Sequence, residues 1–128
     1  MRIRLALVAI PALVAGCATK AVPWSEVTGE RFHLAIADRR AVNIVSVGGT
    51  SAWVSGRPTM VEPGTHRIVI ETLPHGSIRG GRTQAFPLTL APCKRYYVNA
   101  QFAGAIGASF EPVVDEVESL AGCGTRKD

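Results

Sequence analysis

Hydrophobic and polar residues alternate along several short stretches of the chain. The alternation is clearest over residues 66–73, where Ile68 and Ile70 share one face while Arg67 and Glu71 share the other. A period of two residues is typical of β-strands that bury one face. The pattern predicts strands over residues 31–37, 42–47, 52–55, 59–61, 66–73, 83–90, 95–102 and 108–118.

Turn-forming residues separate these stretches. Gly48-Gly49-Thr50-Ser51 and Glu62-Pro63-Gly64-Thr65 are typical turn sequences, and residues 74–82 form a polar loop rich in glycine. Pro87 favours an edge strand or a bulge at 83–90, since proline donates no ladder hydrogen bond. Short strands and frequent turns predict an all-β fold, a single small antiparallel β-sandwich of about seven strands over residues 31–123.

The last stretch of the domain allows two interpretations. A strand over residues 108–118 would pair with residues 95–102 as an antiparallel hairpin, which is the interpretation that we favour. The alternative is a helix beginning at Pro112, because Val113, Val117 and Leu120 follow helical spacing and proline suits a first helical position.

The first sixteen residues have the layout of a secretory signal peptide. Arg2 and Arg4 precede an uncharged apolar run over residues 5–14, and the small residues Ala15 and Gly16 follow. The run is too short to cross a bilayer as a helix, and proline inside it argues against a buried helix. The layout predicts export, with residues 1–16 removed.

The residues at the cleavage site are more specific. Leu13-Val14-Ala15-Gly16-Cys17 resembles the lipobox of bacterial lipoproteins. The resemblance implies cleavage before Cys17, a thioether-linked diacylglyceryl group on its sulfur and acylation of the new amino group. Ala18, rather than aspartate, follows the cysteine, which in such lipoproteins implies sorting to the outer membrane. Residues 17–30 are then expected to be a lipidated N-terminus and flexible tether, and residues 124–128 a disordered tail.

The length and net charge of the mature chain differ from those of the whole chain once the predicted signal peptide is excluded. The whole chain of 128 residues has a formal charge of +4. Removing residues 1–16 takes away Arg2 and Arg4, so the mature chain has 112 residues and a charge of +2. Nearly balanced charge, together with export, argues against nucleic acid as a partner. The length excludes a doubly wound nucleotide-binding domain or a (β/α)₈ barrel.

Lipidation of Cys17 leaves Cys93 and Cys123. Two cysteines in an oxidising compartment are expected to form a disulfide. The competing idea is a metal site that combines them with the three histidines of the chain, His33, His66 and His75. That idea lacks support because these residues show no compact ligand spacing.

Motifs that carry catalysis are missing from the sequence. It contains no Gly-x-Ser-x-Gly, no phosphate-binding loop and no His-Glu-x-x-His. We therefore expect no enzymatic activity, no catalytic residue and no cofactor beyond the covalent lipid. Arg79 and Arg82 in the glycine-rich loop are candidate contacts for a polyanion such as lipopolysaccharide or peptidoglycan. Asp115, Glu116 and Glu118 are expected to form a solvated acidic face.

One stretch resembles a known module. Residues 42–70 resemble PEGA-type modules, which are small β-sandwiches of bacterial envelope proteins. The resemblance is carried by apolar pairs, hairpin glycines and turn residues: Val42, Ile44, Gly48, Gly49, Gly56, Pro58, Pro63-Gly64-Thr65-His66, Ile68 and Ile70. The later Arg95-Tyr96-Tyr97-Val98 resembles a strand of related small lipoproteins. The resemblance implies a structural or interaction module that binds another envelope component and has no catalytic residues.

Overall fold

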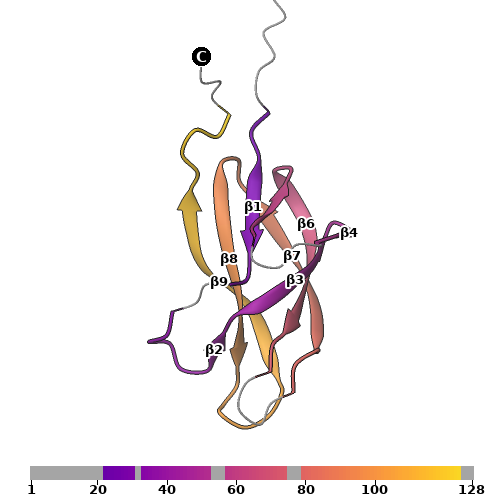
Figure 1. The fold of residues 1–128 in the computed structure, drawn as a ribbon, viewed down its shortest axis with the longest axis vertical. Coiled ribbons are helices and arrows are strands. Elements are labelled where there is room, and N and C mark those ends of the chain that lie inside the picture. Colours follow the sequence, from indigo (N-terminus) through magenta and orange to yellow (C-terminus); the bar gives the residue numbers. More distant parts are fainter. Residues whose placement is uncertain (1–21, 31–32, 53–56, 75–78, 125–128) are drawn as a thin grey trace, which may run out of the picture.

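The computed structural model describes residues 22–30, 33–52, 57–74 and 79–124. Cys17 and the predicted signal peptide lie outside these residues. The described residues form nine strands and no helix (Figure 1). The strands are β1 (Ser25–Thr28), β2 (Arg39–Arg40), β3 (Val42–Val47), β4 (Thr50–Ser51), β5 (Thr59–Val61), β6 (Gly64–Thr72), β7 (Thr83–Leu90), β8 (Lys94–Phe102) and β9 (Phe110–Ser119).

The strands form two sheets. In the first sheet, β9 pairs along one edge of β8, while β1 and β2 pair with consecutive parts of the other edge, and β5 lies outside β1. The second sheet has the order β4-β3-β6-β7. All pairs are antiparallel except β1 with β8, which is parallel. The prediction of a small all-β sandwich is confirmed, with one parallel pair that the sequence did not indicate.

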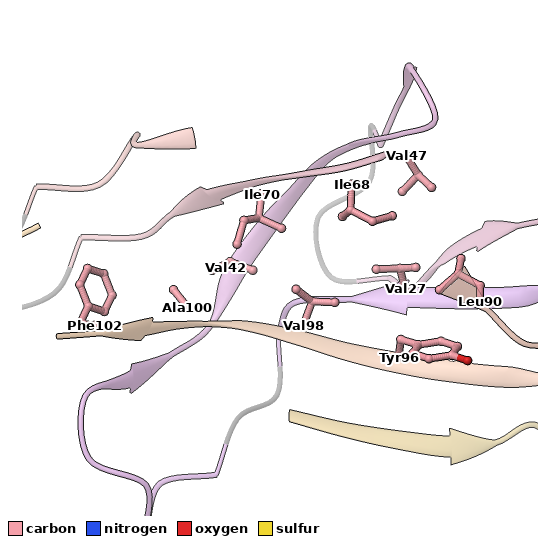
Figure 2. Packing of buried hydrophobic residues seen from close by; sticks show 10 residues of the cluster. All are labelled: Val27, Val42, Val47, Ile68, Ile70, Leu90, Tyr96, Val98, Ala100 and Phe102. Atoms are coloured by element: carbon pink, nitrogen blue, oxygen red, sulfur yellow. The ribbon is translucent and has the colours of Figure 1, made fainter. Parts of the chain in front are cut away.

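The core lies between the two sheets. Ile68 and Ile70 on β6 are fully buried, as their alternation predicts, and they face Val98 and Ala100 on β8 (Figure 2). Val27 on β1 is also fully buried beside them. Inward-facing side chains therefore come from both sheets at alternate positions, which is the arrangement that a period of two residues produces.

The predicted turn at Gly48 and Gly49 forms a hairpin between β3 and β4. Both residues have positive φ angles, 58° and 83°. Two-residue hairpin loops whose twist matches that of the flanking strands require positive φ at both loop positions, and glycine adopts a positive φ without steric cost. The hairpin also brings Gly48 beside His66. The backbone N–H of Gly48 donates to the carbonyl of Arg67 at 2.9 Å, which connects the hairpin to β6.

Two sequence expectations near the start of the domain are wrong. Residues 25–28, which we expected in the tether, form β1 between β5 and β8. A strand of four residues is too short to show a clear periodicity. The described part of the expected strand 31–37 forms turns instead, with Leu34 84% exposed. Both edges of β8 are already taken, one by β1 and β2 and the other by β9, so this segment cannot pair with β8.

The C-terminal stretch is a strand and not a helix. β9 pairs with β8 from Phe110↔Phe102 to Ser119↔Lys94. The strand supplies partners for backbone groups along a whole edge of β8, which a helix could not do. Pro87 lies on β7, at the edge of the second sheet, as expected for proline in a strand.

Candidate functional sites

The disulfide end of the sandwich joins three parts of the chain. Cys93 and Cys123 are bonded, with their Cα atoms 5.3 Å apart, so the predicted pairing is confirmed. The backbone N–H of Cys93 donates to the carbonyl of Trp24 at 2.8 Å, and that of Leu120 donates to the carbonyl of Cys93 at 2.9 Å. The bond and these contacts hold the residues before β1, the start of β8 and the residues after β9 together.

The opposite end carries the basic loop. Its two arginines, Arg79 and Arg82, are both exposed, and residues 75–78 between Pro74 and Arg79 lie outside the described residues. The loop closes where Thr72 and Arg82 pair, with the backbone N–H of Thr72 donating to the carbonyl of Arg82 at 2.8 Å. The structure therefore places both arginines at the end where β7 begins.

A shallow depression of about 450 Å³ adjoins this loop. It lies between the start of β7 and the residues that lead into β9, and its lining is Arg82, Thr83, Gln84, Ala108, Ser109 and Phe110. One guanidinium and several side chains able to donate hydrogen bonds suit an oxyanion such as a phosphate or a carboxylate. Arg79 does not line the depression, so the structure brings only one of the two predicted contacts to it.

A second depression, of about 260 Å³, lies between the β3–β4 hairpin, β5 and the start of β6. Its one imidazole belongs to His66, whose Nε2 is 2.6 Å from the carbonyl oxygen of Glu62. The lining residues include neither serine nor cysteine. The histidine thus holds a turn together through the Glu62 carbonyl.

A buried carboxylate lies on the outer face of the first sheet. Asp115 accepts hydrogen bonds from Arg39 Nη1 at 2.6 Å and His33 Nδ1 at 2.5 Å, and its side chain is 2% exposed. Burial raises the pKa of Asp115, but the hydrogen bonds and charges of Arg39 and His33 outweigh burial and leave the pKa below its ordinary value. Our expectation of a solvated acidic face is wrong for this residue.

A bulge explains why the sequence pattern misses this carboxylate. Tyr97 pairs with Glu116 and the next residue, Val98, pairs with Val114, so Asp115 is an extra residue in β9. Two residues of β9 then oppose one residue of β8, and the strict alternation of faces breaks at that point. Strand periodicity alone gives no signal for a bulge of this kind.

A second ionic cluster connects three strands on the same face. Arg95 on β8 donates from Nε to Glu26 on β1 at 2.6 Å and lies 3.7 Å from Glu118 on β9. The hydroxyl of Tyr97 donates to Glu118 at 2.6 Å. Hydrogen bonds with Tyr97 and Glu26 raise the pKa of Arg95 above its ordinary value. The cluster is a structural connection between strands that are distant in sequence.

The residues that the structure describes show neither a cluster of metal ligands nor a membrane-spanning helix. They contain no group of three or more histidine, cysteine or acidic side chains that could hold a metal ion. His33 and His66 have separate partners, Asp115 and the Glu62 carbonyl, while His75 lies outside the described part. Within the same ranges, no helix is long and apolar enough to span a membrane.

Comparison with protein-family models, curated proteins and solved structures found no match.

Proposed function

We propose that this protein is a lipid-anchored, non-catalytic binding module of the bacterial cell envelope. The support is the sequence around Cys17, which resembles a lipobox, followed by a small disulfide-bonded β-sandwich. Ala18 favours the outer membrane as the location. The domain is the part that binds another envelope component, and the lipid keeps it at the membrane.

One structural observation carries this proposal further. β1 begins at the disulfide end of the sandwich, next to the start of β8. Cys17 precedes Val22, the first described residue, by five positions, and five residues reach at most about 18 Å when fully extended. Lipidation would therefore keep the disulfide end close to the bilayer. The end with Arg82 lies about 27 Å farther along β8 and would face away from that bilayer.

Metabolic labelling tests the anchor. Radiolabelled palmitate should enter the natural protein and should not enter the variant Cys17→Ser. The matched control is Cys93→Ser/Cys123→Ser, which removes two other sulfurs and should keep the label. Labelling of Cys17→Ser would overturn the anchoring proposal, as would loss of label in the control combined with normal labelling of a second lipoprotein.

Crosslinking in intact cells tests the binding role. The tagged protein should enrich a specific envelope component when crosslinked before solubilisation, and the variant Cys17→Ser should enrich less of it. The physical reason is that an anchored module meets its partner at a high local concentration. Repeated capture of no specific component across crosslinkers of different reach would count against a binding module.

A second function is favoured by the depression beside Arg82. We propose as the alternative that the basic end binds a polyanion of the envelope, such as lipopolysaccharide phosphates or peptidoglycan carboxylates. Binding of either probe should weaken as salt rises and should be lost in Arg79→Ala/Arg82→Ala. Arg57→Ala removes another exposed arginine and is the matched control. Equal binding by the double variant and the control would rule this function out.

A further inference from the structure

β9 is the outermost strand of the first sheet, on the side of β8 opposite β1 and β2. Among the residues that the structure describes, β9 pairs with β8 alone. The N–H of Leu120 donates to the carbonyl of Cys93, and the N–H of Ala103 donates to the carbonyl of Ser109. These two bonds fix which residue pairs of the β8–β9 ladder are hydrogen-bonded pairs. Hydrogen-bonded and non-hydrogen-bonded pairs alternate along an antiparallel ladder. Val114 and Val117 therefore belong to non-hydrogen-bonded pairs, and their N–H and C=O groups point away from β8.

Only the second half of this edge can accept a further strand. Pro112 belongs to the set of residues that points away from β8, and it has no N–H to offer there. From Val114 onward, the strand runs through the bulge at Asp115 to Ser119 without proline. The other long edge strand, β7, is interrupted near its middle by Pro87. The segment Val114–Ser119 is therefore the better template for strand addition.

The inner face of this segment is apolar and uncovered. Val114 is 39% exposed and Val117 is 48% exposed. Their partners across the ladder, Val98 and Tyr96, are 0% and 8% exposed. All four side chains lie on the core-facing side of the first sheet, so the second sheet covers β8 but does not reach over β9. An added strand would bury the two valines.

The outer face of the same strand is acidic. β9 contains Glu111, Asp115, Glu116 and Glu118 and no basic residue. Arg39 pairs with Asp115 and Arg95 lies beside Glu118, so the four carboxylates of β9 outnumber these two arginines. Two copies of β9 would bring like charges together, which disfavours a homodimer through this edge.

We propose that Val114–Ser119 binds an extended segment of another envelope protein by strand addition, and that apolar residues alternate with lysine or arginine in that segment. Its apolar side chains would cover Val114 and Val117, and its basic side chains would face Glu116 and Glu118 across the strands. Backbone hydrogen bonds give affinity in this mode of recognition, while the alternating side chains give specificity. The inference rests on the proposed role as a binding module and is independent of lipidation.

A peptide titration tests this surface. The full-length protein in detergent micelles is titrated against a fluorescent peptide of about eight residues that alternates valine and lysine, followed by anisotropy. A peptide that alternates valine and glutamate is the charge control. Val117→Pro removes an N–H from the open edge and leaves the ladder with β8 intact. Val117→Lys changes the side chain and the charge without changing the backbone. Ala85→Pro makes the matched change on the open edge of β7.

The expected results are specific to one edge. The valine–lysine peptide should bind the natural protein and Ala85→Pro equally, and should bind Val117→Pro and Val117→Lys at least about tenfold more weakly. Absence of binding to the natural protein, equal binding to Val117→Lys, or equal binding of the glutamate peptide would each overturn the proposal. If any of these occurs while crosslinking still captures a specific envelope component, the binding role stands and this edge is not its site.

Discussion

Removal of the disulfide tests how the domain is held together at the end where β8 begins and β9 ends. The variant Cys93→Ala/Cys123→Ala opens a loop whose ends are 30 residues apart in sequence. For a loop of that length, the chain-entropy relation gives a loss of about 3.6 kcal/mol in the free energy of unfolding. For a domain of about 100 residues, this corresponds to a decrease of about 15–30 °C in Tm.

The folded structure of the variant should change little, because backbone bonds hold the same corner. The Cys93 N–H bonds Trp24 and the Cys93 carbonyl accepts from Leu120, and neither contact uses the sulfur. Cys93 has a φ of 58°. This left-handed backbone conformation costs about 1–2 kcal/mol for any residue with a Cβ, so alanine at position 93 is strained as much as cysteine. A second variant, Cys93→Gly/Cys123→Ala, relieves this strain and should recover about 1 kcal/mol of the loss.

Urea denaturation followed by far-ultraviolet circular dichroism measures these differences, with the chemically reduced natural protein as a further sample. The reduced protein and the alanine variant should unfold at the same urea concentration. A loss below about 1 kcal/mol would refute the reasoning, because it would mean that the unfolded chain gains little freedom when the loop opens. A glycine variant less stable than the alanine variant would refute the argument about backbone strain.

Three further predictions concern single side chains. Because the pKa of Asp115 is below its ordinary value, its stabilisation is complete above the ordinary pKa of aspartate and is lost as the pH falls through the lower, folded-state pKa. The urea midpoint of Asp115→Asn should depend less on pH in acid, and an unchanged pH profile would contradict this assignment. Arg39→Ala leaves a buried carboxylate with His33 as its remaining hydrogen-bond partner, and should cost about 3 kcal/mol in urea titrations at neutral pH, whereas a loss no larger than that of a surface substitution would contradict the ion pair. Gly29→Ala would bring a Cβ against the carbonyl oxygen of Val42 and should cost about 2–4 kcal/mol, seen as a lower Tm, and an unchanged Tm would show that the backbone there can shift.

The parts of the fold that sequence could predict are those fixed by local patterns. β6 and the hairpin at Gly48–Gly49 follow from alternation and turn residues within a few positions, and the disulfide follows from counting cysteines. β1 could not be predicted, because its place depends on pairing with β8 through contacts such as Glu26 with Arg95, 69 residues apart. Asp115 was misassigned because a bulge shifts the faces of β9, and such a shift depends on the partner strand.

The same distant pairing gives the domain a firm attachment point under the proposed anchoring. A lipid on Cys17 would pull on the domain through the residues that lead into β1. This strand pairs with β5 on one side and with β8 on the other, so a pull along its axis loads the hydrogen bonds of both ladders together instead of opening them in turn. Trp24, just before β1, is bonded to Cys93, which the disulfide ties to the C-terminal segment. β1, which the sequence pattern did not predict, is therefore the strand that would join a lipidated N-terminus to the sandwich.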